Sequence, residues 1–219
     1  MSQSLSSRFR LLALLLCLFA FSGCAQAYYG MMETFGQHKR DILVSRIKDT
    51  RDDQVQTKQV FKDALTRFSE VVKVEPSALE STYKKLKSDL ENCESQAQTV
   101  RDRIASVEDV AQVLFDEWNK ELSQYTNAQL RSASESKLRD TRQRYDQLLS
   151  AMKRAQDKME PVLTAFRDQV LFLKHNLNAQ AVASLSGTVQ SLQSDVQKLI
   201  NEMESSIAQA DTFINSLNK

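Results

Sequence analysis

Apolar residues recur every seven positions over long stretches of this chain, and this repeat limits the possible folds more than any other feature. In the clearest stretch, one row consists of Leu79, Leu86, Cys93, Val100, Val107 and Leu114, and the interleaved row of Tyr83, Leu90, Ala97, Ile104, Ala111, Trp118 and Tyr125. The two rows alternate by four and three residues, as in the a/d seam of a coiled coil or bundle helix. The pattern predicts a helix over about 78–125.

Two later stretches carry the same repeat, and the first stretch carries a broken form of it. The later ones predict helices over about 128–175, with rows from Leu138 and Thr141, and over about 179–217, with rows from Val182 and Leu185. A first helix is expected over about 28–73. Its ends are apolar but its middle, 48–59, is nearly all polar, which indicates either a solvated waist or a partner surface.

The breaks between these stretches fall at residues that end or cap helices. Glu75-Pro76-Ser77 separates the first two, since the residue before Pro avoids the α region. Asn127 offers an N-cap, and Asn176 and Asn178 offer a stop and a further cap. Because the connections are short, consecutive helices should run antiparallel. We predict an all-α, elongated up-down-up-down four-helix bundle forming one domain over 24–219, with Pro161 kinking the third helix.

The first 23 residues resemble a bacterial lipoprotein signal peptide. Arg8 and Arg10 form a basic start, Leu11 to Phe21 is an apolar run too short to span a bilayer, and Phe21-Ser22-Gly23-Cys24 resembles a lipobox. We expect cleavage before Cys24 and acylation of its thiol with fatty acids such as palmitate. The alternative is an ordinary secretory leader with cleavage near Ala27. Ala25, where an Asp would resemble an inner-membrane retention signal, favours the periplasmic face of the outer membrane.

Loss of the leader leaves a nearly neutral chain with one free cysteine. The full chain has 29 basic and 28 acidic residues, and removal of Arg8 and Arg10 changes the formal charge from +1 to −1. A neutral chain lacks the field that attracts nucleic acid, so we expect no nucleic-acid partner. Cys93 is expected to be a buried apolar residue, with a redox role as the alternative.

No arrangement of residues in the sequence points to catalysis. His38 and His175 belong to opposite ends of expected helices, about 50 Å apart, so they cannot share a metal ion. Metal-binding spacings, phosphate-binding loops and nucleophile motifs do not occur in the sequence. We therefore expect no enzymatic activity, no cofactor and no metal site.

Two surface features could serve a partner or the cell wall. An apolar cluster at the end of the third helix exceeds what a two-residue seam needs, which indicates either a packed bundle tip or a partner patch. It comprises Val170, Leu171, Phe172 and Leu173, with His175 and Leu177 beyond. Lys219 resembles the terminal Lys by which some helical lipoproteins join peptidoglycan, but an even number of antiparallel helices would return it toward the membrane, which argues against that tether.

Several segments together resemble one family over essentially the whole mature chain. They are Tyr28-Tyr29-Gly30, 38–41, 114–118, 166–169 and, most specifically, the stretch 173–180 that ends in Asn178-Ala179-Gln180. The family is the uncharacterised helical proteobacterial domain of unknown function 2959. The resemblance implies a helical fold, and it implies no activity and no residue roles.

We therefore expect a membrane-anchored periplasmic lipoprotein with a non-enzymatic structural or adaptor role, which binds an envelope protein or itself through helical surfaces. The alternative is a helical chaperone or carrier that opens to bind lipid or an apolar client. The two differ in a simple observation, because a carrier would co-purify with lipid or bind apolar dyes.

Overall fold

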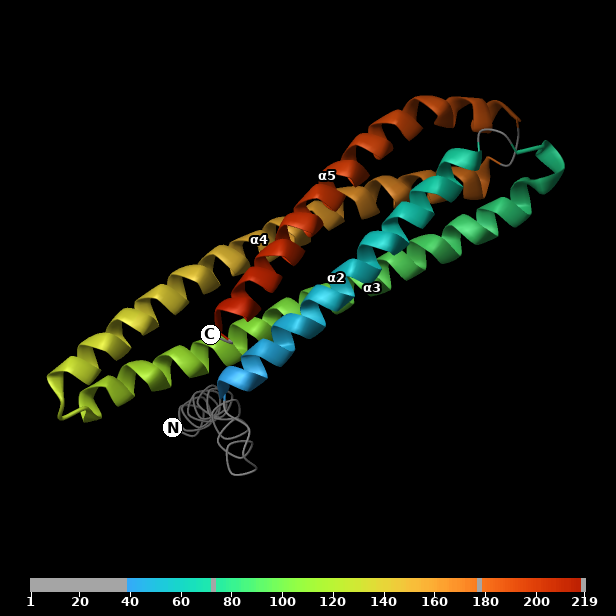
Figure 1. Cartoon of the computed structure of the whole chain (residues 1–219). Coiled ribbons are helices and arrows are strands. Elements are labelled where there is room, and N and C mark those ends of the chain that lie inside the picture. Colours follow the sequence, from blue (N-terminus) through green and yellow to red (C-terminus); the bar gives the residue numbers. More distant parts are fainter. Residues whose placement is uncertain (1–38, 72–73, 177–178, 218–219) are drawn as a thin grey trace, which may run out of the picture. The chain divides into compact units, whose positions relative to one another are not determined.

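The computed structural model describes residues 39–71, 74–176 and 179–217, leaving out the side chains of Pro76 and of 179–186. This part of the chain contains no strand, and its four α-helices are α2 (Lys39–Glu70), α3 (Leu79–Glu121), α4 (Ala128–His175) and α5 (Ala179–Leu217) (Figure 1). Short 3-10 turns, Pro76–Ala78 and Leu122–Gln124, precede α3 and follow it. The predicted all-α helical bundle is confirmed.

The helix ends follow from local chemistry at two of the predicted positions. The side-chain Oδ1 of Asn127 accepts hydrogen bonds from the backbone N–H groups of Gln129 (2.9 Å) and Leu130 (3.2 Å), and thus caps α4 as expected. At the other end of α4, the backbone N–H of Asn176 donates to the carbonyl of Leu173 (3.2 Å) and its side chain to that of Phe172 (2.9 Å). Pro161 lies inside α4 on its exposed face, and the helix continues through it.

The first two helices are shorter at their carboxyl ends than the sequence predicts. Helix α2 ends at Glu70 instead of 73. Helix α3 ends at Glu121, and a 3-10 turn covers Leu122–Gln124, which was expected to be helical up to 125. Tighter 3-10 turns are common at helix ends because they satisfy carbonyl groups that have no partner within the helix.

The contacts of the chain divide it into two compact units. The described residues of unit 1 are 39–43 and 108–138, which include the start of α2, the end of α3 and the start of α4. Those of unit 2 are 44–71, 74–107, 139–176 and 179–217. The prediction of one domain over 24–219 stays a prediction.

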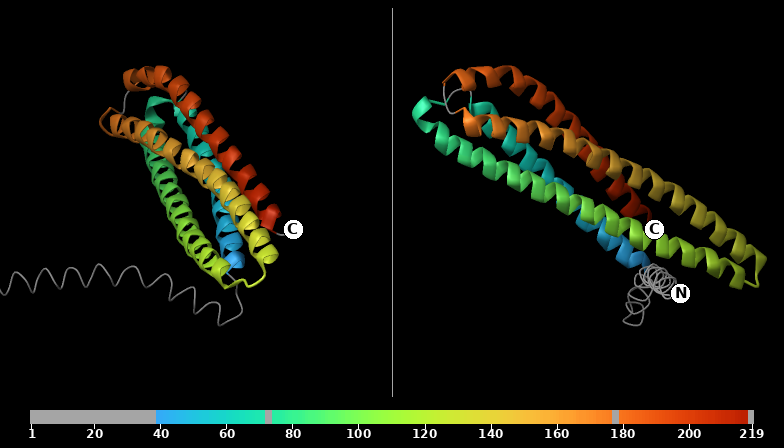
Figure 2. Two further views of the ribbon diagram at one scale, coloured as in Figure 1. Left: turned by 90° about the vertical axis from the view of Figure 1, so that its left-hand side faces the viewer. Right: turned by 180° about the vertical axis from the view of Figure 1, so that it is seen from behind.

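Unit 2 is an antiparallel four-helix bundle. Two ion pairs join α2 to α5, Arg51–Asp211 (2.8 Å) and Lys58–Glu204 (3.1 Å). The α2 partner moves seven residues toward the carboxyl end while the α5 partner moves seven residues toward the amino end, so the two helices are antiparallel. The other neighbouring helices are antiparallel by the same comparison. The contacts are Asp53–Arg103 and Arg67–Asp89 between α2 and α3, and Arg101–Glu160 and Glu94–Arg167 between α3 and α4. Between α4 and α5 they are the Arg154–Glu202 ion pair and the Tyr145–Phe213 ring contact. The carboxyl ends of α2 and α4 and the amino ends of α3 and α5 accordingly lie at the same end of unit 2 (Figure 2).

The apolar rows predicted from the heptads form the core, but the buried face of α3 moves by one residue along the helix. The row is buried from Leu79 to Val107, after which Phe115 is buried and Leu114 only partly so. A straight helix drifts by about 20° per heptad, so the five heptads from Leu79 to Leu114 shift the face by about 100°, or one residue. Tyr125, the last residue of the interleaved row that starts at Tyr83, is 42% exposed.

The described residues of unit 1 include a buried lysine, Lys39, and Trp118, the only tryptophan in the sequence. Lys39, 4% exposed, donates to Glu117 at 2.9 Å (Oε1) and lies 2.8 Å from its other oxygen. The Trp118 indole N–H donates to the hydroxyl of Ser134 at 2.9 Å, which joins the end of α3 to the start of α4. Phe115 and Leu122 are buried apolar residues of the same unit.

Candidate functional site: a buried polar layer and an open groove

The structure describes only some of the residues singled out from the sequence. Cys24, His38, Leu177 and Lys219 lie outside the described residues. His175 is the last residue of α4 and is exposed. The predictions of an anchor at Cys24 and of a distance between the two histidines therefore stay predictions.

The apolar cluster at the end of α4 is divided between core and surface. Val170 and Leu173 are buried, at 7% and 1% exposure, and belong to the core of unit 2. Leu171 and Phe172 are 56% and 39% exposed. Leu171 and Phe172 therefore form the exposed part of the cluster among the described residues, and a partner patch there stays a prediction.

Cys93 is buried, as predicted from its place in the heptad row. Its Sγ lies 4.0 Å from the backbone carbonyl oxygen of Val60 on α2. Burial, together with the nearby carboxylate of Asp89, raises the pKa of the Cys93 thiol to about 12, although Arg67 acts in the opposite direction. Because the thiolate is the reactive form, this environment is that of an inert core residue.

The polar middle of α2 differs from the sequence prediction, because three of its polar side chains are buried. Thr50, Gln54 and Thr57 are all 0% exposed. They continue the three-and-four spacing of the buried α2 residues Ile47 and Phe61 on either side. The expected solvated waist or partner surface is therefore wrong for this face of α2, which carries polar side chains into the core.

The buried polar side chains differ in how their hydrogen-bonding groups are used. The hydroxyls of Thr50 and Thr57 donate to the carbonyl oxygens of Arg46 and Asp53, each at 2.7 Å, within their own helix. The amide of Gln54 has no partner for either Nε2 or Oε1 among the described residues. On α5 the hydroxyl of Ser206, also 0% exposed, is equally without a partner there.

Gln54 and Ser206 lie at the same level of unit 2. Gln54 falls between Arg51 and Lys58 on α2, and Ser206 falls between Glu204 and Asp211 on α5, which are the partners of those two cations. We define Thr50, Gln54, Thr57 and Ser206 as the polar layer. The sequence holds a signal for it, because Ser206 occupies the one position that the heptad row Leu185, Leu192, Leu199 and Phe213 skips.

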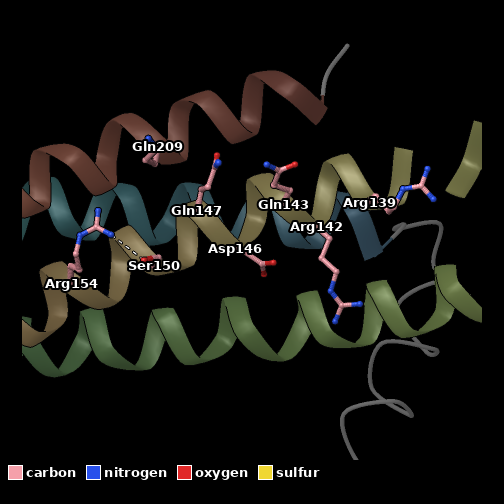
Figure 3. A pocket seen from close by; sticks show the side chains of 8 residues that line it. All are labelled: Arg139, Arg142, Gln143, Asp146, Gln147, Ser150, Arg154 and Gln209. Atoms are coloured by element: carbon pink, nitrogen blue, oxygen red, sulfur yellow. Dashed lines mark hydrogen bonds between the residues drawn. The ribbon is translucent and has the colours of Figure 1, made fainter. Parts of the chain in front are cut away.

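Outside the core, α4 carries an open groove of about 810 Å³ (Figure 3). Its lining comes from successive turns of one helix face, with one residue from α5, and consists of Arg139, Arg142, Gln143, Asp146, Gln147, Ser150, Arg154 and Gln209. Gln143 and Gln147 point from α4 toward α5, where Gln209 lies (Figure 3). The groove therefore presents guanidinium, amide and hydroxyl groups to one surface.

At one end of the groove, Arg154 hydrogen-bonds within α4 and across to α5. It donates from Nη1 to the hydroxyl of Ser150 at 3.0 Å and from Nε to Glu202 of α5 at 3.1 Å. The lining holds three guanidinium groups and one carboxylate, Asp146. Such a surface suits recognition of a polar partner by directional hydrogen bonds, with a moderate preference for anionic groups.

Two general features of the described part complete this description. Within residues 39–71, 74–176 and 179–217, no cluster of three or more His, Cys, Asp or Glu side chains is placed to hold a metal ion. No helix there combines the length and the hydropathy needed to cross a bilayer.

Comparison with known proteins identifies a family. The model of a family described as "Protein of unknown function (DUF2959)" matches residues 28–217. No curated protein and no solved structure matches the chain.

Proposed function

The chain belongs to the family of proteins of unknown function DUF2959, and from this premise we propose that it is a lipid-anchored, non-enzymatic adaptor at the periplasmic face of the outer membrane. The structural observation that carries the adaptor role is the groove on α4. The groove offers hydrogen-bonding side chains from successive turns of α4 and one from α5. The anchor rests on the lipobox-like Phe21-Ser22-Gly23-Cys24 after a short apolar run.

The groove suits a helix from another protein. Its α4 lining residues recur at each turn of the helix from Arg139 to Arg154, so they cover about 23 Å at 1.5 Å per residue. A partner helix lying along this face would meet amides that both donate and accept, and guanidinium groups that pair with carboxylates. An envelope protein and a second copy of the chain are both partners of this chemistry.

Site-specific photocrosslinking in intact cells tests the adaptor role. A photoreactive amino acid at Gln143 or Gln147 should give discrete crosslinked products with an envelope protein or with the chain itself. The matched control is Glu91, an exposed position on α3, which should give none. Filling the groove with Gln147→Trp should reduce crosslinking from Gln143, and equal crosslinking from Glu91 and the groove would refute the assignment.

Metabolic labelling with a fatty-acid analogue tests the anchor separately. Cys24→Ala should abolish labelling and release the protein from the outer-membrane fraction. Cys93→Ala is the matched control, since this buried thiol should contribute no label. Labelling that survives Cys24→Ala would remove the anchor from the proposal without affecting the groove.

A second candidate function, carriage of lipid or an apolar client, is supported by the polar layer. Buried groups without hydrogen-bond partners lower the stability of the closed bundle, and a carrier must open. Purification from cells followed by lipid extraction, together with binding of an apolar fluorescent dye, tests this role. A protein without bound lipid and without dye binding would contradict it.

A further inference from the structure

We propose that unit 2 opens reversibly along the contact between α2 and α5, beginning at the polar layer. We define this contact, from the Arg51–Asp211 pair to the Lys58–Glu204 pair, as the α2–α5 seam. The inference concerns the fold of unit 2 and does not depend on the anchor or on the groove.

The first argument is the cost of the unpaired groups. The Gln54 amide can form four hydrogen bonds and the Ser206 hydroxyl up to three, and neither forms one with the described residues although both side chains are 0% exposed. Both would hydrogen-bond to water once the seam opened. Closing the seam at this level therefore carries the full desolvation cost of two polar groups.

The second argument is that these groups are confined to one seam. Among the described residues, the buried side-chain atoms without a hydrogen-bond partner belong to Gln54 on α2 and Ser206 on α5. At the middle of the other two helices the buried residues are apolar, and they include Val100 and Ile104 on α3 and Met152 and Ala155 on α4. The interior is thus weakest where α2 meets α5.

The third argument is that little else holds the seam closed. Its ion pairs have partly exposed partners, because the side chains of Asp211 and Glu204 are 49% and 53% exposed. Exposed pairs contribute little to stability. Helices α2 and α5 are also the first and last helices of unit 2, so no turn joins them, whereas α2–α3 and α4–α5 are joined by short connections.

The apolar core on either side of the layer limits the extent of the opening. On α2, Ile47 lies before it and Phe61 and Phe68 after it, all at most 1% exposed. Phe68 also packs edge to face against Phe166 of α4, with ring centroids 6.0 Å apart. We therefore expect a local opening of about two helical turns on each side of the seam, with α3 and α4 remaining packed.

Hydrogen exchange measured by mass spectrometry on the full chain tests the opening. Backbone amides of 48–60 on α2 and 201–212 on α5 should exchange at least about tenfold faster than those of 97–107 on α3 and 148–159 on α4. The pair Gln54→Met and Ser206→Ala, which removes the unpaired groups at similar volume, should slow exchange in both segments by about tenfold. Either single substitution should slow exchange in both segments, although the segments lie on different helices.

Thr57→Val is the matched control, because it removes a buried hydroxyl that is already bonded to Asp53. It should leave the exchange of the α5 segment within about twofold of the original. Exchange of α2 and α5 at the same rate as α3 and α4 in the unsubstituted chain would overturn the proposal. So would equal slowing of all four helices by the double substitution, since that would mean an effect on global unfolding alone.

Discussion

Cys93 lies in the core of unit 2, where its thiol is 0% exposed and faces the carbonyl oxygen of Val60. Burial in an apolar surrounding disfavours the thiolate more than any charge nearby favours it, so the pKa rises to about 12. The same residue would be reactive on a surface. Its environment therefore decides its chemistry, and this predicts two measurable properties.

The first prediction concerns alkylation. At pH 8 a thiol with a pKa of about 12 is ionised about a thousandfold less than one with the ordinary pKa of 9.0. We expect iodoacetamide to modify Cys93 at least about a thousandfold more slowly in the native protein than in denaturant. Similar rates in both states, followed by mass spectrometry, would show that the thiol is accessible.

The second prediction concerns alkaline stability. The folded-state pKa of Cys93 is raised above the unfolded value, so the stability that depends on the neutral thiol is complete below pH 9 and is lost between pH 9 and about 12. The loss amounts to about 1.4 kcal/mol for each pH unit in that window. Urea unfolding at pH 8 to 10.5 should show a smaller decline for Cys93→Ala, whose stability is lower throughout. Parallel declines would contradict the raised pKa.

At the scale of the helix, α3 illustrates how a repeat in the sequence is converted into a buried face. The heptad row predicts Leu114 as a core residue, but the drift of a straight helix places Phe115 there at 2% exposure. Phe115→Ala should therefore lower the free energy of unfolding by about 3–5 kcal/mol. Leu114→Ala, at a partly buried position, should lower it by about 1 kcal/mol. Denaturant titration of both variants tests this, because a strict seven-residue repeat would make Leu114→Ala the more destabilising of the two substitutions.

Helix α4 provides a prediction about capping. Asn127→Ala removes the acceptor for the N–H groups of Gln129 and Leu130, and should lower the free energy of unfolding by about 1 kcal/mol. Asn127→Asp keeps the acceptor and adds a charge that favours the helix N-terminus, so it should retain or slightly raise stability. A loss of equal size in both variants, measured by thermal unfolding, would contradict the capping role.

Sequence patterns predicted the helices well because an apolar repeat has a direct physical meaning. The bounds of α4 and α5 coincide with the ranges expected from their rows and caps. The polar layer was missed because Thr50, Gln54 and Thr57 break the apolar pattern while keeping its spacing. The groove could not be predicted, since it depends on which exposed turns of α4 lie beside Gln209 of α5.

At the scale of the whole molecule, the helices of unit 2 are joined at their margins by ion pairs and in their interior by apolar side chains. The pairs between helices are mostly exposed, for example Arg167–Glu94 at 47% and 37%. Raising the salt concentration from 0.05 to 0.5 M should therefore change the free energy of unfolding by no more than about 2 kcal/mol. Met152→Ala, at a 0% exposed position, should cost about 2–5 kcal/mol at either salt concentration. A larger change in the free energy of unfolding with salt than with Met152→Ala would show that ion pairs contribute more to stability than apolar packing does.

The hydrogen bond between Trp118 and Ser134 gives the molecule a natural optical reporter. Because the sequence contains one tryptophan, intrinsic fluorescence excited at the indole band reports on unit 1 alone, while the thiol of Cys93 reports on unit 2. Helices α3 and α4 each continue without a break from one unit into the other. We expect the two signals to change at the same denaturant concentration, and two separate midpoints would reveal a chain that melts in two steps.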